Sequence, residues 1–278
     1  MSDVSATSFL TLYCHAADAR SGEPVLNDIK SLEIAAFLDT FLSSSADPLA
    51  RDLVAGRLKG SLVTHIAMRA KRYDDYVRDF LSRYPKGVVV NIGCGLDSRF
   101  FRTDNGTVQF YDLDLPEVVS LRQRFFRETS RYHQIASSVL DHEWMDLVSV
   151  HRGPFLFMAE GVFMYLRPDK VKSLVLELQK RFPGSELVCE VVNGKWLKGP
   201  FGNIVDFKMR RELHIGKEAA FQSGISHTRE MEEWTPGIEF LDDWSYLDSY
   251  EKKLGWLRIF RNIRWIRYIQ WTVHYRLN

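Results

Sequence analysis

The sequence has few cysteines and no long apolar segment. Its three cysteines, Cys14, Cys94 and Cys189, lie far apart in 278 residues, without a CxxC pair or a nearby histidine cluster. This pattern argues against a disulfide framework and against a zinc site, and it favours a reducing compartment. The N-terminus lacks the basic segment of a signal peptide, and no stretch approaches the roughly 18 apolar residues of a membrane span. We therefore expect a cytoplasmic protein without stable membrane insertion.

The chain also lacks an excess of charge of one sign. Its 37 Lys and Arg residues and 36 Asp and Glu residues give a formal net charge of +1. Because no global positive field results, nucleic acid is not an expected partner. Apolar residues make up 45% of the chain and charged residues 26%, which is typical of a globular protein. The length suits one large α/β domain with insertions.

The spacing of apolar residues divides the chain into four parts. Residues 1–85 have helical spacing and are expected to form part of a lid. Residues 86–194 alternate short apolar runs with helical segments, which predicts a Rossmann-like core. Residues 195–240 interrupt this alternation and are predicted to be an inserted helical lid. Residues 241–278 return to the core sheet and end in a period-two pattern that predicts a late antiparallel edge strand.

The predicted strands are short apolar runs of the kind that a sheet buries on both faces. They comprise residues 88–92, 108–111, 155–159 and 186–192. Helical segments lie between them, at about residues 116–128 and 168–182. Strands that alternate with helices imply a mostly parallel sheet with right-handed crossovers.

A glycine-rich turn follows the first predicted strand. Gly93-Cys94-Gly95 comes directly after residues 88–92, and glycine lets the backbone approach a ligand closely at the carboxyl end of a strand. The dinucleotide fingerprint requires a third glycine where this chain has Ser98, and no GxxxxGK[ST] loop is present. The turn indicates a cofactor site, although a purely structural turn would have the same sequence.

Two aspartates close the next predicted strand, about twenty residues after the glycines, where Rossmann-like folds carry an acidic ribose ligand. Asp112 and Asp114 are two residues apart and therefore point the same way on an extended chain. A carboxylate there accepts hydrogen bonds from ribose hydroxyls. Asp114 could instead cap the helix that begins at Pro116. We favour ribose binding.

Five blocks of sequence occur in the order and spacing of a known family. They are IAMRAKRYDDYVRDFL, IGCGLDSRFFR, YDLDLPEVVSLR, SSVLDHEW and AEGVFMYL. They resemble the leucine carboxyl methyltransferase family, in particular its bacterial branch with the tetracenomycin-type polyketide carboxyl O-methyltransferases. The resemblance implies an enzyme that uses S-adenosyl-L-methionine. It also implies a class I methyltransferase fold, which is an α/β, mostly parallel, seven-stranded sheet with an antiparallel edge and a helical lid.

The resemblance also implies roles for individual residues. Arg69 should bind a carboxylate, either that of the methionine moiety or that of the acceptor, and a planar bidentate donor suits this task. Gly93 and Gly95 should line the methyl donor, while Asp112 and Asp114 belong to the ribose side.

Further along the chain, Ser138 and Val139 should flank the adenine, with Asp141 near its amino group. Glu160 should lie beside the sulfonium. Tyr165 has two interpretations, since it either faces the acceptor, as a catalytic candidate together with Arg69, or packs beneath the sheet edge.

The sequence departs from the family at three positions. His15 stands where relatives commonly have Arg or Lys, which weakens one carboxylate contact or suits the pocket to another substrate. Ser98 replaces a common threonine and keeps its hydroxyl. Ser138 stands where some relatives have aspartate, so an adenine-side hydrogen bond is in doubt.

Methyl transfer from a sulfonium is an in-line displacement, for which the protein supplies placement and electrostatics. A carboxylate acceptor, with a pKa near 4, is ionised at neutral pH and needs no general base. A phenolic acceptor, with a pKa near 10, needs one. Candidate bases are His15, His65 and His227. Candidate aromatic contacts for the sulfonium are Phe163, Tyr165 and Trp196.

Other functions are compatible with parts of the sequence. Two features argue against an NAD(P)-linked oxidoreductase. Ser98 stands in place of the third glycine of the dinucleotide fingerprint, and a Tyr-xxx-Lys pair in a suitable helix is absent. A non-catalytic binding protein could use residues 254–276, which carry five arginines, three tryptophans and no acidic residue, to rest on an anionic surface. Protein C-termini are a third class of acceptor. We predict an O-methyltransferase that methylates a carboxylate of a small, polyketide-like metabolite without a dedicated general base, and a phenol or hydroxyl acceptor with a histidine base is the alternative. A homodimer is one option for its assembly.

Overall fold

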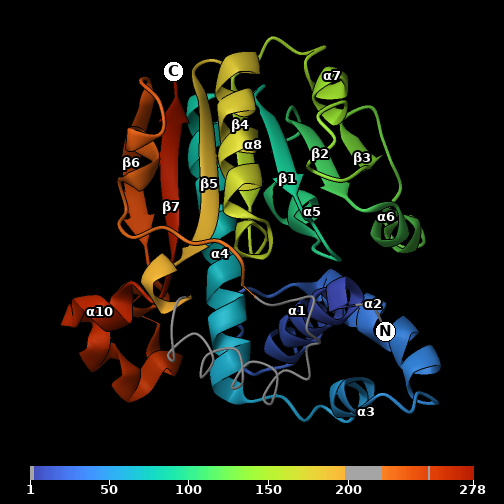
Figure 1. The fold of residues 1–278 in the computed structure, drawn as a ribbon. Coiled ribbons are helices and arrows are strands. Elements are labelled where there is room, and N and C mark those ends of the chain that lie inside the picture. The colour runs from blue at the N-terminus through green and yellow to red at the C-terminus, as the bar shows by residue number, and fades with distance from the viewer. Residues whose placement is uncertain (1–2, 198–220, 250) are drawn as a thin grey trace.

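The computed structural model describes residues 3–197, 221–249 and 251–278. Its strands form one seven-stranded sheet in the order β3-β2-β1-β4-β5-β7-β6 (Figure 1). β1 to β5 run parallel, and β7 runs antiparallel to both β5 and β6. The strands are β1 (Val88–Ile92), β2 (Gln109–Asp114), β3 (Tyr132–Ala136), β4 (Phe155–Ala159), β5 (Ser185–Val192), β6 (Ile238–Trp244) and β7 (Gln270–Leu277). The predicted α/β class, with a mostly parallel sheet and an antiparallel side, is confirmed.

The helices lie on both faces of the sheet and at one of its ends. α1 to α3 gather at the end that is lowest in Figure 1, and the long helix α4 begins beside them and continues behind the sheet. The helices before the sheet are α1 (Asp3–Ala19), α2 (Ile29–Leu42), α3 (Pro48–Val54) and α4 (Gly60–Arg83). Those that follow β1 are α5 (Arg99–Thr103), α6 (Pro116–Arg122), α7 (Trp144–Val148), α8 (Pro168–Arg181) and α10 (Arg264–Arg267).

Two hydrophobic clusters cover the two faces of the sheet. Tyr73 and Phe80 of α4 pack with Val89 of β1 on one face, and Leu174 of α8 packs with Val90 on the other. Neighbouring strand residues point to opposite faces, so β1 is buried at every position. Burial on both faces explains why the central strands read as continuous apolar runs.

The two outermost strands are those that the apolar pattern did not predict. β3 and β6 form the edges of the sheet and are only partly buried. Residues 271–277 do form an antiparallel strand, as predicted, but β7 lies between β5 and β6 and not at the edge. Because β7 has neighbours on both sides, Thr272 and His274 are buried like the apolar residues between them.

The division of the chain into four parts stays a prediction, and the described elements lie in these parts as follows. Residues 1–85 contain α1 to α4, and residues 86–194 contain β1 to β5. Of the predicted lid, residues 198–220 lie outside the described residues. Its described remainder includes a short 3-10 helix, Glu230–Glu233, and the start of β6. Among the described helices, none has the length and apolar character needed to cross a membrane.

Arg122, at the end of α6, connects the helix to the sheet and to the glycine turn. Its side chain is fully buried, and its guanidinium donates hydrogen bonds to Asp112 and, at 2.9 Å, to the hydroxyl of Tyr132. Its Nη1 donates to the carbonyl oxygens of Gly95 at 2.7 Å and Asp97 at 2.9 Å. One buried cation therefore holds the backbone of the turn in place.

We expect the substitution Arg122→Met to lower the free energy of unfolding by about 3–5 kcal/mol, because it leaves the charge of Asp112 buried without its partner. Urea denaturation followed by circular dichroism measures the change. The double variant Arg122→Met/Asp112→Leu removes both charges and should regain most of the loss. Equal losses in the single and double variants would contradict this explanation.

Candidate functional site

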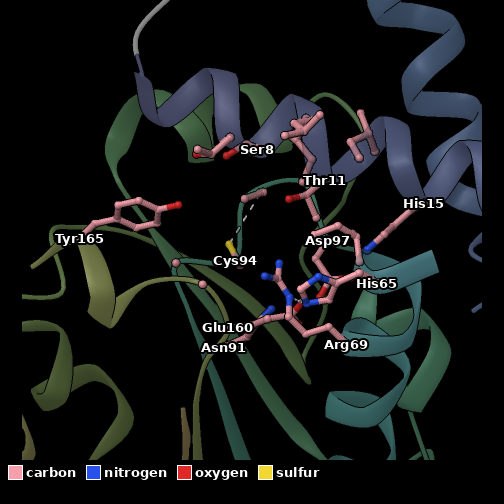
Figure 2. A pocket seen from close by; sticks show the side chains of 18 of the residues that line it. Ser8, Thr11, His15, His65, Arg69, Asn91, Cys94, Asp97, Glu160 and Tyr165 are labelled. Atoms are coloured by element: carbon pink, nitrogen blue, oxygen red, sulfur yellow. Dashed lines mark hydrogen bonds and ion pairs between the residues drawn. The ribbon is translucent and has the colours of Figure 1, made fainter. Parts of the chain in front are cut away.

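A cavity of about 270 Å³ lies at the carboxyl ends of β1 and β4 (Figure 2). Its walls include the turn after β1 (residues 93–97), the loop and 3-10 helix after β4 (residues 160–165), the inner face of α1 and the first half of α4. Ser8 and Thr11 of α1 lie above the turn in this view. The carboxyl ends of parallel strands are where open α/β sheets bind ligands, so we take this cavity as the candidate site.

The turn after β1 depends on its two glycines. Gly93 has a φ of +64° and Gly95 a φ of +52°, a left-handed conformation that is strained for residues with a Cβ atom. A Cβ on Gly93 would lie 2.4 Å from Cγ2 of Val162, and one on Gly95 would lie 3.2 Å from Oγ of Ser8. The glycines therefore let the turn approach both the loop after β4 and α1.

Asp114 is attached to the same turn. Its Oδ2 accepts a hydrogen bond from the amide of Gly95 at 2.7 Å, and its Oδ1 accepts one from the amide of Leu115 at 2.8 Å. Burial raises the pKa of Asp114 above its usual value, although these two amides oppose the shift. The structure thus brings the predicted glycines and Asp114 together, although Asp114 itself is not among the residues that line the cavity.

Asp112 lies elsewhere, although the sequence grouped it with Asp114. Its carboxylate is 2% exposed and accepts hydrogen bonds from Asn91 at 3.0 Å and Tyr132 at 2.7 Å, besides that from Arg122. Asp112 does not line the cavity. Its contacts are those of a core residue that supports the turn from below.

Arg69 of α4 reaches the cavity between two glutamates. Its Nε donates to Oε1 of Glu160 at 2.8 Å, and its Nη1 donates to Oε2 of Glu190 at 2.9 Å. The sequence did not predict these contacts. They use two of the guanidinium nitrogens of Arg69 for carboxylates of the protein itself. Its Nη2 has no hydrogen-bond partner within the described parts of the chain.

Glu160, at the end of β4, carries its charge at the floor of the cavity. It also accepts a hydrogen bond from Nη2 of Arg99 at 2.6 Å. Burial alone would raise the pKa of Glu160, but Arg99 and Arg69 outweigh it and hold the pKa below its usual value. Glu160 is therefore ionised at neutral pH.

The three predicted adenine-side residues continue the carboxyl edge of the sheet past Asp114. The amide of Ser137 donates to the carbonyl of Asp114 at 2.9 Å, which joins this loop to the end of β2. The carbonyl of Val139 accepts from the indole of Trp144 at 3.1 Å. None of the three residues, which are Ser138, Val139 and Asp141, lines the cavity.

Tyr165 faces the cavity from a 3-10 helix after β4, Phe163–Tyr165 (Figure 2). Burial raises the pKa of Tyr165 to about 12, and its ring lies 5.4 Å from that of Phe221, measured between centroids. Phe163 is 1% exposed and does not line this cavity. The side chain of Trp196, the other aromatic candidate, lies outside the described part of the structure.

Two of the three candidate histidines line the cavity. Burial and the charge of Arg69 lower the pKa of His65 to about 4. Nδ1 of His15 lies 3.2 Å from Oδ2 of Asp28. His227 lies at the surface, 3.2 Å from Glu233, and is not among the lining residues.

Apart from His15, sequence reasoning missed the residues that α1 supplies, and it also missed the aspartate beside the glycine turn. Ser8, Thr11 and Asp97 all line the cavity. Asp97 lies within the quoted motif IGCGLDSR and could have been singled out as an acidic group next to the turn. No signal marks the α1 residues, because their position depends on how α1 packs against the turn.

The chain matches known proteins over most of its length. The family described as leucine carboxyl methyltransferase matches residues 35–179. The tetracenomycin polyketide synthesis O-methyltransferase TcmP of Streptomyces glaucescens is 31% identical over 250 residues, which cover 90% of this chain and 85% of that protein. The S-adenosyl-L-methionine-dependent methyltransferase dpfgK of Gibberella zeae is 28% identical over 268 residues, which cover 90% of this chain and 86% of that protein.

A solved structure shares the fold. A DUF574-family protein from Streptomyces avermitilis superimposes with a TM-score of 0.58 at 12% identity, over 88% of this chain and 97% of that chain. The similarity to the family over residues 35–179 and the 31% identity to TcmP both agree with the motifs seen in the sequence. The chain therefore belongs to the leucine carboxyl methyltransferase family.

Proposed function

We propose that this protein transfers a methyl group from S-adenosyl-L-methionine to a carboxylate oxygen of a small, polyketide-like metabolite. The observation that carries the proposal is the cavity at the carboxyl ends of β1 and β4, where the glycine turn, Glu160 and Arg69 meet. The relative TcmP, a polyketide O-methyltransferase by its name, supports the class of acceptor.

The residues on the turn fit the adenosyl part of the methyl donor. Each oxygen of Asp114 accepts one backbone hydrogen bond, while a carboxylate offers about four lone-pair sites. Asp114 therefore keeps acceptor capacity for ribose hydroxyls. Ser138, Val139 and Asp141 flank the adenine in this proposal. Asp112 supports the turn and does not contact the ligand.

The charge around the cavity fits a cationic ligand. When bound, S-adenosylmethionine supplies a methyl group activated by a sulfonium. Among the residues that line the cavity, the carboxylates of Asp97 and Glu160 are balanced by the guanidinium groups of Arg69 and Arg99. The attraction for a sulfonium therefore comes from the position of Glu160 and not from an excess of negative charge. Opposite charges attract more strongly in a buried site than in water.

A carboxylate acceptor agrees with the groups available for catalysis. With a pKa near 4 it is ionised at neutral pH and needs no base. Arg69 offers Nη2 to its second oxygen, and Tyr165 offers a hydroxyl that stays protonated, since its pKa is about 12. A phenol would need a base with a pKa near the working pH. His65, with a pKa of about 4, is poorly matched to that task.

We expect the substitution Asp114→Ala to weaken the binding of S-adenosylmethionine by roughly 1.5–3 kcal/mol, or about ten- to hundredfold in Kd, because hydrogen bonds to a charged group are lost. Titration calorimetry measures the affinity. The control is Asp104→Ala, which removes a carboxylate paired with Arg131 away from the cavity. An unchanged Kd in Asp114→Ala would exclude Asp114 from the site.

We expect the affinity for the methyl donor to decrease at acid pH. The pKa of Asp114 is raised, so its carboxylate becomes protonated at a pH above about 3.9, the usual pKa of aspartate. The protonated carboxyl group has less capacity to accept hydrogen bonds. Calorimetry between pH 4 and 8 measures this. The variant Asp114→Asn should bind weakly and without this pH dependence. If the affinity of Asp114→Asn decreased in the same way at acid pH, a group other than Asp114 would be the cause.

We expect base-labile methyl esters as products when aromatic polyketide-like acids are supplied, and no ethers from the matching phenols. Mass spectrometry before and after mild alkaline hydrolysis distinguishes the two. The variant His65→Phe should keep kcat, because no base is needed. A loss of roughly a hundredfold or more, which is the usual contribution of a general base, would favour a hydroxyl acceptor.

A further inference from the structure

The C-terminal surface, which comprises residues 252–269 between β6 and β7, exposes a cluster of apolar side chains. It consists of a 3-10 helix, Lys252–Asn262, followed by α10. Ile259 is 68% exposed and Trp265 is 60% exposed, and Ile263 and Ile269 are exposed as well. Single exposed apolar side chains are common, but four of them within residues 259–269 indicate an interaction surface.

The charge of the C-terminal surface has one sign. No Asp or Glu occurs in residues 252–278. Lys252 and Arg264 form no ion pair within the described parts of the chain, so their charges are available to a partner. Exposed basic residues and exposed apolar residues therefore alternate along the same segment. The exposed basic residues are Lys252, Lys253, Arg261 and Arg264.

The inner side of the C-terminal surface is attached to the body of the protein. Leu254 is 4% exposed. Nη2 of Arg267 lies 2.7 Å from a carboxylate oxygen of Asp243 and 2.7 Å from one of Asp248. Because Arg267 pairs with both of these aspartates, they contribute little to offset the exposed positive charge.

The C-terminal surface lies at the same end of the sheet as the cavity. Figure 1 shows α10 at the end where α1 to α3 gather. Gln270, which directly follows the surface, lines the cavity and donates to Oε1 of Glu190 at 2.6 Å. A partner that covered residues 252–269 would therefore be held at the end of the molecule that contains the candidate site.

Two kinds of partner fit only one property of this surface. A second copy of the chain would bring the same patch onto itself, as symmetric dimers do, and like charges would then meet. Nucleic acid would attract the basic residues, but its non-specific binding is mainly electrostatic. It would leave the exposed isoleucines without an apolar environment.

An anionic lipid surface fits both properties. Its headgroups attract Lys and Arg side chains, and tryptophan is enriched at the boundary between headgroups and acyl chains. Aliphatic side chains of a peripheral segment are buried at that boundary, next to basic residues that stay among the headgroups. Such binding is reversible and requires no segment that crosses the bilayer.

We propose that the C-terminal surface binds reversibly to anionic lipid membranes. Lys252 and Arg264 contact the headgroups, while Ile259 and Trp265 are buried at the acyl boundary. The end of the protein that contains the cavity then lies next to the membrane. This interaction goes beyond the proposed methyl transfer and depends neither on the methyl donor nor on the acceptor.

The test is co-sedimentation of the full chain with lipid vesicles. One set of vesicles contains equal parts of phosphatidylcholine and phosphatidylglycerol, and the other contains phosphatidylcholine alone. We expect the wild type to bind the anionic vesicles and not the neutral ones. Added salt should release it, because salt screens exposed charges.

The variant Lys252→Gln/Arg264→Gln tests the basic residues. We expect it to bind the anionic vesicles about tenfold or more weakly, because each basic residue near an anionic surface contributes to binding. The matched control is Lys86→Gln/Arg152→Gln, which removes one exposed lysine and one exposed arginine just before β1 and β4. These positions are at the other end of the sheet, so the control should bind as the wild type does.

The variant Ile259→Ser tests the apolar residues. We expect it to bind the anionic vesicles about fivefold or more weakly, because one apolar side chain is no longer buried. Its matched control is Val150→Ser, since Val150 is 72% exposed between α7 and β4. Lipids with brominated acyl chains should quench the tryptophan fluorescence of the wild type, and should quench that of Trp265→Phe less.

Several results would overturn this inference. One is the absence of binding to the anionic vesicles, and another is equal binding to the neutral ones. An equal loss in Lys86→Gln/Arg152→Gln would show that net charge, and not this surface, is responsible. If Ile259→Ser binds as the wild type does and brominated lipids do not quench, the surface is a general site for polyanions, and RNA should then compete with the vesicles.

The substituted side chains are exposed, so the variants should keep the circular dichroism and the unfolding temperature of the wild type. Both measurements separate a loss of membrane binding from a loss of fold. Vesicle binding is also independent of methyl transfer. A chain that binds vesicles without transferring methyl groups would contradict only the proposed function, and the reverse result would contradict only the membrane surface.

Discussion

Three arginines at the cavity, two of them buried and one partly buried, hold its walls together through ion pairs. Arg69 comes from α4, and Arg99 and Arg102 come from α5. Each contacts at least two carboxylates, and these belong to the start of α2, to α4, to the glycine turn and to the ends of β4 and β5. Because a buried charge without a partner is strongly destabilising, none of these segments can move far without the others. The site is therefore preorganised by the ion pairs that surround it.

The same ion pairs decide which polar atoms remain for a ligand. Most donors and acceptors of the cluster are used within the protein, and Nη2 of Arg69, a lining residue, is left without a hydrogen-bond partner among the described residues. A ligand meets groups whose positions and charges are already determined, which reduces the reorganisation needed on binding. This arrangement suits methyl transfer, in which the protein supplies placement and electrostatics while the methyl donor supplies the reactive group.

Much of the fold could be predicted because its central strands are buried on both faces. The runs at residues 88–92 and 155–159 appear as β1 and β4, and Gly93, Gly95 and Asp114 meet as the motif suggested. The edge strands β3 and β6 escaped notice because partly exposed strands tolerate polar residues and lose the apolar signal. Asp112 was misleading for a related reason, since alternation places it on the same side as Asp114 but does not show that Asp112 is buried against Arg122.

The sequence by itself determined the class of the sheet, its glycine turn and the family, because apolar periodicity and motif spacing are properties of neighbouring residues. Only the tertiary structure decided which charges meet. Arg69 and Glu190, for example, are 121 residues apart and join through a hydrogen bond of 2.9 Å. Likewise, His15 becomes a cavity residue only because α1 packs over the turn after β1. Such contacts depend on how whole elements pack against one another, and no local pattern records that packing.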